Sequence, residues 1–413
     1  MNDRVILHVD INNCFASIEM LHHPKLRGKP MAVGGSVEDR HGIILAKNYE
    51  AKAYGIKTAE TIWEAKKKCP QLIVVPPDFD KYLRFSKLFR QILLDYSDQV
   101  EPFGIDEAWL DVSGSTQLFG SGEQIADTIR NRVKSELGIT VSVGVSFNKI
   151  FAKLGSDMKK PDAVTVINKE NYQTLAWPLP VGDLLGVGRA TQNRLRYQIR
   201  TIGELAQANP QHLKWLFGKR GLILHSFANG WDTSTVKPAG FESCVKSVGN
   251  SSTCPRDLAD EQDVRIVFQS LAESVAERMR DLAVMARTVQ ISLRTNDLYW
   301  FERQTALARP SMVSDELTAA AMKLLREHYH WEKPLRSIGI RGTNLISTKG
   351  ARQLSLFADE QGREQSERVE YAIDDIRRRF GHHAINRALL VVDRKLGKLD
   401  AKSNHTIHPV SFS

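Results

Sequence analysis

Two acidic segments, far apart in the sequence, carry side chains that could do chemistry. Asp10 ends an apolar run, and Asp106 and Glu107 follow a second one. Adjacent carboxylates beside apolar residues repel each other and resist burial unless a cation compensates them. Hard divalent cations prefer oxygen ligands, and two such ions about 3.5–4 Å apart clamp the attacking and leaving oxygens of a phosphoryl transfer. If these acids converge, we expect a metal-dependent phosphoryl-transfer site; the alternative for any single acid is a helix cap or a turn.

Short strands must position these acids. Residues 4–9 form an apolar run that is typical of a buried strand, and residues 140–146 form another. Helical patterns alternate with the strands at residues 12–21, 81–97, 123–137 and 148–158. This alternation predicts an α/β layer with helices packed on a sheet.

The sequence changes character after residue 178. Residues 182–236 are helical and basic, and residues 242–348 place an alternating strand at 288–294 between helical patterns at 263–283 and 312–328. The latter segment is therefore expected to be an α+β domain. Beyond residue 349 the chain is polar, and then a helix is predicted whose apolar positions are Val369, Ala372, Ile373, Ile376 and Phe380.

Composition limits the class of protein. The 413 residues suffice for several domains, and a hydrophobic content of 42% with 25% charged residues is ordinary for soluble globular proteins. The net charge of +9 favours polyanionic partners, nucleic acid above all. The four cysteines have no C-x-x-C spacing, which argues against zinc and disulfide frameworks. Without an apolar run of membrane-spanning length or a signal-peptide pattern, we expect a cytoplasmic chain with no membrane partner.

Six motifs, in order, resemble those of the Y-family DNA polymerases and are closest to the DNA polymerase IV branch. They lie at residues 8–19, 48–52, 104–108, 143–149, 157–161 and 185–188, and the resemblance covers residues 4–346. It implies a multidomain α/β and α+β fold, the right-hand polymerase. The implied domains are a palm at 1–10 and 78–167, fingers at 11–77, a helical thumb with a helix-hairpin-helix at 168–236, an α+β little finger at 242–348, and a C-terminal tail at 349–413.

The resemblance gives the acids a role. Asp10, Asp106 and Glu107 match the family's metal-binding catalytic triad, with the Ile11 backbone carbonyl as a further ligand. The implied cofactor is Mg²⁺, two ions per site, with Mn²⁺ as an alternative because hard oxygen ligands accept both. One ion would lower the pKa of the primer 3′-hydroxyl, and the other would hold the triphosphate and its pyrophosphate leaving group.

Other motif positions match residues that bind the incoming deoxynucleoside triphosphate. Tyr49, Lys52 and Lys160 match triphosphate contacts, since a phenol and two ammonium groups can counter its charge. Phe15 matches the steric gate, a ring that leaves no room for a 2′-hydroxyl. The alternatives are that both aromatic residues pack in the core and that the lysines form a solvated face.

Four positions depart from the common family pattern, and one of them, Asn12 in place of a frequent Asp, leaves the acidic triad intact. Lys52 stands where many relatives carry Arg, and Lys cannot make a bidentate fork to phosphate. Ile43 and Leu45 occupy the roof over the nascent base pair, where many relatives place smaller residues. A bulkier roof could narrow the range of damaged templates that the enzyme accepts.

Primer–template DNA is the implied macromolecular substrate. Gly186, Gly188 and Arg189 resemble the turn of a helix-hairpin-helix, where glycines let the backbone approach phosphate oxygens; an ordinary packing corner is the alternative. In the little finger, five basic residues are expected phosphate partners: Lys246, Arg287, Arg294, Arg336 and Arg341.

A short motif in the tail implies a protein partner. Gln353, Leu354, Leu356 and Phe357 lie in a pentapeptide that resembles the bacterial sliding-clamp-binding motif, and a surface loop with a local packing role is the alternative. The resemblance implies a monomeric, error-prone polymerase for translesion synthesis, which associates with the nucleoid through DNA. No separate set of exonuclease acids is evident, so no proofreading is expected.

Two other functions fit part of the pattern. A catalytically silent DNA-binding subunit could recruit factors through the clamp motif, but such a subunit has no chemical need for three clustered carboxylates. A metal-dependent nuclease fits the acids but not Phe15, Tyr49 and Lys160 together.

Overall fold

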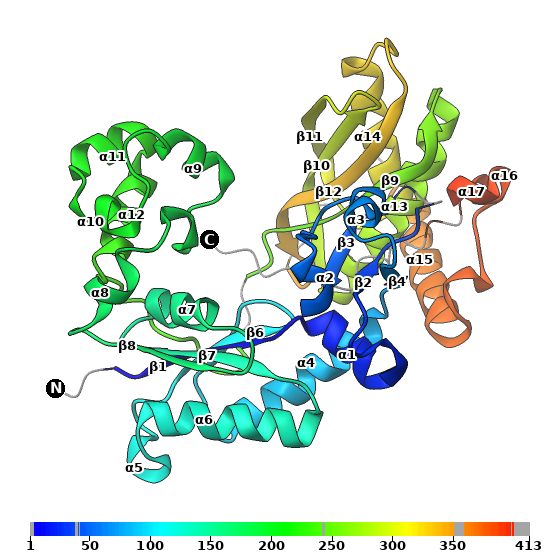
Figure 1. Ribbon diagram of the computed structural model, residues 1–413. Helices are drawn as coiled ribbons and strands as arrows, with labels where there is room; N and C mark the ends of the chain where they lie inside the picture. The colour runs from blue at the N-terminus through cyan, green and yellow to red at the C-terminus, as the bar shows by residue number, and fades with distance from the viewer. Residues whose placement is uncertain are drawn as a thin grey trace. The chain divides into compact units, whose positions relative to one another are not determined.

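The computed structural model describes residues 4–37, 40, 42–241, 244–350, 359–397 and 399 (Figure 1). The chain divides into two compact units. The first contains the described residues of 1–35 and 43–242, and the second contains those of 36–42 and 243–406. No helix among the described residues is long and apolar enough to cross a membrane.

A five-stranded sheet forms the centre of the first unit. Its strand order is β5 (Val100–Pro102), β6 (Glu107–Asp111), β1 (Ile6–Ile11), β7 (Val141–Ser146) and β8 (Val164–Ile167). β1 is central and pairs antiparallel with both β6 and β7, whereas β7 and β8 are parallel. The two strands predicted at 4–9 and 140–146 are therefore confirmed as strands, and the structure shows that they are neighbours in the sheet.

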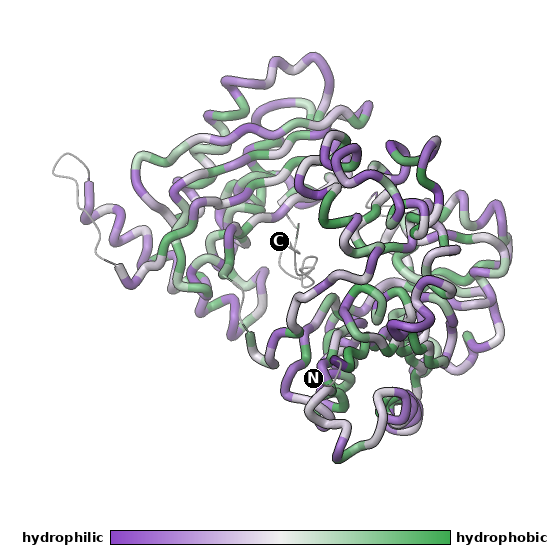
Figure 2. The backbone as a smooth tube through the Cα atoms, turned by 90° about the vertical axis from the view of Figure 1, so that its left-hand side faces the viewer, coloured by the Kyte–Doolittle hydropathy of each residue, from purple (hydrophilic) through white to green (hydrophobic). Residues whose placement is uncertain are grey.

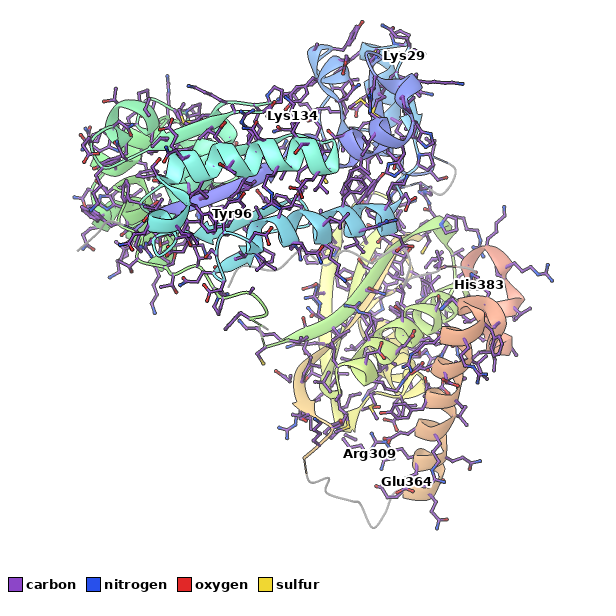
Figure 3. All side chains as sticks on the ribbon, turned by 90° about the horizontal axis from the view of Figure 1, so that it is seen from below. Lys29, Tyr96, Lys134, Arg309, Glu364 and His383 are labelled. Carbon is purple, nitrogen blue, oxygen red and sulfur yellow. The ribbon has the colours of Figure 1, made fainter. Side chains whose placement is uncertain are left out.

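Three helices cover the two faces of this sheet: α4 (Phe79–Leu94), α6 (Gly122–Arg132) and α7 (Lys149–Met158). Leu7 and Val9 of β1 share a core with α4 and α6, which lie side by side across one face (Figure 3). Successive strand residues point to opposite faces, so Ile6 and Asp10 point to the other face, which α7 covers. Asp10 is therefore directed toward α7.

α7 lies very close to the sheet because Gly144 of β7 has no side chain. A Cβ atom at Gly144 would lie 1.8 Å from the carbonyl oxygen of Ala152 and 2.5 Å from the nitrogen of Ser156, both in α7. Gly155 of the helix faces Gly144, and a Cβ there would lie 3.2 Å from the Gly144 Cα. The two glycines therefore set the distance between the sheet and this helix.

Two smaller assemblies complete the first unit. A three-stranded sheet, in the order β3 (Ile44–Lys47), β2 (Met31–Gly34) and β4 (Ile73–Val75), shares a core with α2 (Tyr49–Ala53) and α3 (Ile62–Lys68). A helical assembly shares a core with Ile150, Phe151 and Leu154 of α7. Its helices are α8 (Tyr172–Ala176), α9 (Arg189–Leu195), α10 (Ile202–Gln207), α11 (Pro210–Phe217) and α12 (Lys219–Ala228).

The second unit is an antiparallel sheet with helices on one face. The strand order is β11 (Trp300–Ser311), β10 (Val284–Thr295), β12 (Leu335–Ser347) and β9 (Ser247–Leu258), and the core helices are α13 (Glu261–Asp281) and α14 (Ser314–His328). Hydrophilic and hydrophobic stretches both occur along the backbone of this sheet (Figure 2), and in β10 the buried Val289, Ile291 and Leu293 alternate with more exposed polar residues. The predicted strand at 288–294 lies within β10, and the other three strands were not predicted.

The C-terminal helices pack on the second unit: α15 (Glu360–Phe380), α16 (Ala388–Val392) and α17 (Arg394–Gly397). The helix predicted from apolar positions exists as α15, but those positions do not form its buried face. Val369 and Phe380 are 49% and 67% exposed, whereas the charged residues Glu370, Asp374 and Arg377 are buried.

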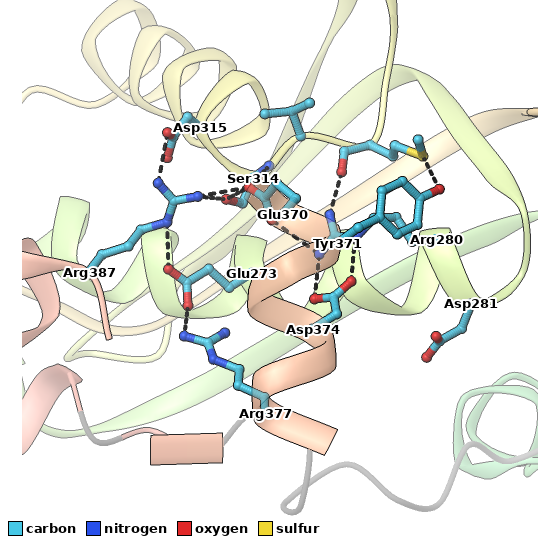
Figure 4. A network of polar contacts seen from close by, with 12 residues as sticks. Glu273, Arg280, Asp281, Ser314, Asp315, Glu370, Tyr371, Asp374, Arg377 and Arg387 are labelled. Carbon is cyan, nitrogen blue, oxygen red and sulfur yellow. Dashed lines mark hydrogen bonds and ion pairs between the residues drawn. The ribbon is translucent and has the colours of Figure 1, made fainter. Parts of the chain in front are cut away.

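α15 docks through ion pairs (Figure 4). Arg280 of α13 donates to both carboxylate oxygens of Asp374 at 2.6 and 2.8 Å and lies 3.1 Å from Glu370. Arg377 donates in turn to Glu273 of α13 at 2.7 Å. Buried charges require partners of this kind, so the docking interface is ionic rather than apolar.

Candidate active site

The backbone brings the three predicted acids together where the end of β1 lies beside the start of β6. Asp10 of β1 is the direct register partner of Glu107 of β6, and residues directly opposite in antiparallel strands point to the same face. The Ile11 N–H donates to the carbonyl oxygen of Asp106 at 2.9 Å. Segments far apart in the sequence therefore converge, which is the condition under which the acidic pattern indicates a metal site.

Glu107 is held by a lysine of α7. Its Oε2 accepts a hydrogen bond from Lys153 Nζ at 2.5 Å and lies 3.4 Å from His8 Nε2. The other ring nitrogen of His8, Nδ1, lies 2.8 Å from the Ser156 hydroxyl of the same helix. α7 therefore fixes both side chains on this face of the sheet.

A second lysine holds Asp10. Lys160 Nζ lies 2.7 Å from Asp10 Oδ1 and 2.9 Å from Asp157 Oδ1. Asp157 Oδ2 also lies 3.6 Å from Lys153 Nζ. The contacts form a chain of alternating charges that runs from Asp10 through Lys160, Asp157 and Lys153 to Glu107.

The lysines compensate the acids only in part. Burial, followed by the charges of Asp10 and Glu107, raises the pKa of Asp106 to about 6. Burial also raises the pKa of Asp10, although Lys160 opposes this shift. Burial and the Lys153 charge lower the pKa of His8 to about 3, so its imidazole is neutral near pH 7 and adds no positive charge.

The donor set suits divalent ions chemically. Carboxylate and carbonyl oxygens are the ligands that hard cations prefer. The pKa values of Asp10 and Asp106 are raised chiefly because burial disfavours the charged carboxylates, and a bound cation would offset this cost. Within the described ranges, no three His, Cys, Asp or Glu side chains gather around one point. Asp10 and Glu107 instead direct oxygens at Lys160 and Lys153.

Phe15 is fixed by aromatic neighbours. It lies on α1 (Cys14–His22), half-buried, and its ring stacks on Tyr82 of α4 with centroids 4.2 Å apart and an interplanar angle of 9°. Phe79 contacts the same ring edge-on at 6.0 Å. The ring is thus both a packed residue and a partly accessible surface.

Tyr49 and Lys52 lie on α2, which Asn48 caps by accepting from the Ala51 N–H at 3.0 Å. Lys52 is exposed, and its Nζ lies 5.6 Å from the centre of the Tyr49 ring. Burial raises the pKa of Tyr49, while the charges of Lys160 and Asp10 act in opposite directions. These couplings place Tyr49 within electrostatic reach of the acids.

The roof residues differ in exposure. Ile43 is 40% exposed and forms an isolated bridge with Thr61. Leu45 lies in β3 and is half-buried. Both flank Ile44, which is fully buried in the core of this small sheet.

The glycines of the predicted hairpin precede α9. Gly186 has a φ of +90°, and a Cβ there would meet the Arg220 guanidinium. Gly188 is the N-cap residue of α9, with open space around its Cα, and Arg189 begins the helix and is exposed. The segment ahead of this turn is a single 3₁₀ turn, Val181–Asp183, rather than a full helix.

Two of the five basic residues of the second unit lie on the sheet face opposite its helices. Ile291 and Ile340 belong to the helix-covered core, so their strand neighbours point away from it. Arg294 pairs in register with Ser337, and Arg341 pairs with Gln290. Both arginines are exposed.

The other three basic residues lie outside the regular strand pairing, and the tail motif is not described. Lys246 is exposed just before β9, and Arg287 and Arg336 lie at register shifts of β10 and β12. The tail motif with Gln353, Leu354, Leu356 and Phe357 lies outside the described residues.

Sequence reasoning did not single out Lys153 or Asp157 as site residues. Their four-residue spacing on the predicted helix at 148–158 was the available signal, because it puts both on one helix face. That this face points at the acids depends on how α7 packs, which no local pattern indicates.

Comparisons with known proteins agree with the motifs. A model described as the impB/mucB/samB family matches residues 9–157, and one described as the C-terminal domain of that family matches residues 245–356. DNA polymerase IV of Acetivibrio thermocellus is 50% identical over 397 residues, which cover 96% of this chain and 100% of that protein. DNA polymerase IV 1 of Bacillus subtilis (strain 168) is 39% identical, with 93% of this chain and 92% of that protein covered.

A solved structure extends the likeness to the fold. The Y-family DNA polymerase chimera Dbh-Dpo4(243-245)-Dbh matches with a TM-score of 0.73 at 25% sequence identity, covering 83% of this chain and 99% of that one. The right-hand polymerase fold expected from the motifs is thereby confirmed. Family models, relatives and fold agree that the chain belongs to the impB/mucB/samB family, the Y-family DNA polymerases.

Proposed function

We propose that Asp10, Asp106 and Glu107 form the centre at which this chain adds deoxynucleotides to a primer 3′-hydroxyl. Its family and the names of its relatives make it a DNA-directed DNA polymerase of the translesion type. The observation that carries the assignment is the β1–β6 register, which puts Asp10 directly opposite Glu107. The backbone carbonyl of Asp106 accepts a hydrogen bond from the N–H of Ile11, the residue after Asp10.

Family membership implies the use of divalent metal ions, and we propose two Mg²⁺ ions, with Mn²⁺ as an alternative. The three carboxylates and the Ile11 carbonyl would hold them. When bound, such ions lower the pKa of the attacking hydroxyl and stabilise the charge on the leaving pyrophosphate. The protein contributes the fixed positions of the acids, set by paired strands.

The nucleotide contacts are proposed from motif position and surroundings. Tyr49, Lys52 and Lys160 would bind the triphosphate, which is consistent with the coupling of Tyr49 to Lys160 and Asp10. Phe15, held by Tyr82 and Phe79, would exclude a 2′-hydroxyl, because a clamped ring cannot move aside. Ile43 and Leu45 would form the roof over the base pair.

The DNA contacts would be electrostatic and independent of sequence. The Gly186–Gly188 turn, together with Arg189, would bind the phosphate backbone of duplex DNA. Arg294 and Arg341, on the sheet face opposite the helices, would contact further phosphates. The tail motif would recruit a sliding clamp, and binding to DNA would keep the enzyme, a monomer, at the nucleoid. Phosphate contacts of this kind weaken steeply as salt rises.

Primer extension with Mg²⁺ and deoxynucleotides on an undamaged primer–template tests the assignment. We expect Asp106→Ala to lose extension by about a thousandfold or more while it still binds the duplex. Asp375→Ala removes a carboxylate that is 60% exposed on α15 and serves as the matched control. Extension by Asp106→Ala at the wild-type rate would refute the site. If the wild type binds DNA but adds nothing with any divalent ion, the silent recruiting subunit is the better interpretation.

A further inference from the structure

Lys153 and Asp157 have no role in the function proposed above, yet both contact its charged groups. Lys153 Nζ lies 2.5 Å from Glu107 Oε2 and 3.6 Å from Asp157 Oδ2. Its side chain is 17% exposed, whereas that of Asp157 is 47% exposed. One ammonium group therefore lies between a half-buried carboxylate, that of Glu107, and a more exposed one, that of Asp157.

We propose that Lys153 is the resident counter-ion of Glu107, and that Asp157 receives the lysine when Glu107 binds a divalent ion. Both are positioning residues, since neither is assigned to substrate or metal. The inference rests on the proposed function, because it takes Glu107 as a metal ligand.

Competition for one oxygen gives the physical basis. A metal ion on Glu107 Oε2 cannot share that oxygen with an ammonium group at hydrogen-bond distance, and the two cations repel each other. Lys153 must then move, and a partly buried ammonium without a partner is costly. Asp157 is one helical turn further along α7, on the same face, so the lysine needs only a side-chain rotation to reach it.

Two neighbours favour an ammonium group in this position. The Lys153 ammonium lies 5.2 Å from the centre of the Phe103 ring, within the distance at which an aromatic face attracts a cation. Asp157 already pairs with Lys160 at 2.9 Å, and its pKa is lowered by Lys153 and Lys160 against the opposing effect of burial. Asp157 is therefore an ionised acceptor that can serve both lysines.

A general electrostatic field would predict some of the same effects. Loss of a positive charge near any cation site strengthens cation binding, and loss of a negative charge weakens it. The two explanations differ in coupling: a field acts additively, whereas transfer of one lysine makes the effect of Asp157 depend on Lys153. A double-mutant cycle measures this dependence.

The experiment is Mn²⁺ binding to the full-length protein without nucleotide, followed by the electron paramagnetic resonance signal of free Mn²⁺. We expect Lys153→Met to bind Mn²⁺ about fivefold more tightly and Asp157→Asn about fivefold more weakly than wild type. In the Lys153→Met background, Asp157→Asn should change the Mn²⁺ affinity by less than about twofold. This small remaining effect would come from the loss of the contact between Asp157 and Lys160.

Matched controls come from an exposed pair with the same spacing. Lys323 and Glu327 of α14 lie 3.8 Å apart and are 68% and 48% exposed. Lys323→Met and Glu327→Gln make the same changes in net charge on a helix of the second unit, so Mn²⁺ affinity should stay at the wild-type value. Circular dichroism of each variant checks that it is folded.

The outcomes separate the two proposals. An equal effect of Asp157→Asn with and without Lys153 overturns the transfer, as does a Lys153→Met variant whose Mn²⁺ affinity equals that of wild type. Asp106→Ala is measured alongside: if it leaves Mn²⁺ binding intact, the proposed metal site itself fails. If Asp106→Ala abolishes binding while the Lys153 and Asp157 variants bind as wild type, only the transfer fails.

Discussion

The protonation of Asp106 links the acids to the stability of the fold. Its pKa is raised to about 6 by burial and by its neighbours, so its favourable contribution to folding is complete only below the ordinary Asp value and is lost as pH rises through about 6. Asp106→Asn is uncharged at every pH. We expect this variant to be more stable than wild type by ~1–3 kcal/mol at pH 8, and its advantage to be about 1 kcal/mol smaller at pH 5.

Urea unfolding at the two pH values, with EDTA to remove divalent ions, measures this difference. A stability advantage that is the same at pH 5 and pH 8 would contradict the raised pKa. An Asn variant no more stable than wild type at pH 8 would show that the lysines neutralise the acids fully.

For single residues, the sequence indicated the motif positions but not the side chains that contact them in the folded protein. Asp106 and Glu107 stood out as adjacent carboxylates beside an apolar strand, and the motif resemblance added Asp10 and the expected role of all three as metal ligands. Lys153 and His8 could not be assigned, because Lys153 is one of many lysines and a histidine in a strand is ordinarily a core residue. Their contacts with the site become evident only in the folded structure, where α7 crosses the sheet above β1.

Among the elements, the contact between α7 and β7 leaves no room for a larger side chain. A methyl group at Gly144 would overlap backbone atoms of α7, and backbone cannot move aside as a flexible side chain can. We expect Gly144→Ala to lower the free energy of unfolding by about 2–4 kcal/mol. Because the helix carries Lys153 and Asp157, the same variant should lose most of its primer extension.

Gly114→Ala is the matched control, since a Cβ there meets nothing within 4 Å. Chemical unfolding of both variants under one condition gives the comparison. Equal stability of the two would mean that α7 can shift without cost.

Strands and helices were predicted unequally, for physical reasons. β1 and β7 are buried on both faces and stand out as apolar runs, whereas β9 and β12 carry Ser, Gly and Arg on an open face. α15 shows the opposite failure. Its apolar residues suggested a buried stripe, but charged residues are buried instead, because complementary charges on α13 outweigh the usual cost.

For the molecule as a whole, the ionic network makes the C-terminal helices part of the second unit. Arg280 and Asp374 are 2% and 1% exposed, so removal of one partner leaves a buried charge with reduced compensation. We expect Asp374→Ala to destabilise the second unit by about 3 kcal/mol. Native-state hydrogen exchange of the α13 amides reports this unit separately from the first.

Asp375→Ala, one residue further along, removes only an exposed pair with Arg379 at 3.6 Å. Its effect should stay below about 0.5 kcal/mol. Similar exchange rates in the two variants would show that α15 docks without depending on Arg280.

The pairing of β1 between β6 and β7 has a consequence for how this protein can change during evolution. Substitutions along β1 alter one side chain at a time, but inserting or deleting one residue before Asp10 shifts every later side chain to the opposite face. Asp10 would then enter the apolar layer beneath the sheet, while a hydrophobic neighbour replaced it beside Glu107. Libraries of variants should therefore tolerate conservative apolar replacements in this strand more readily than any change in its length.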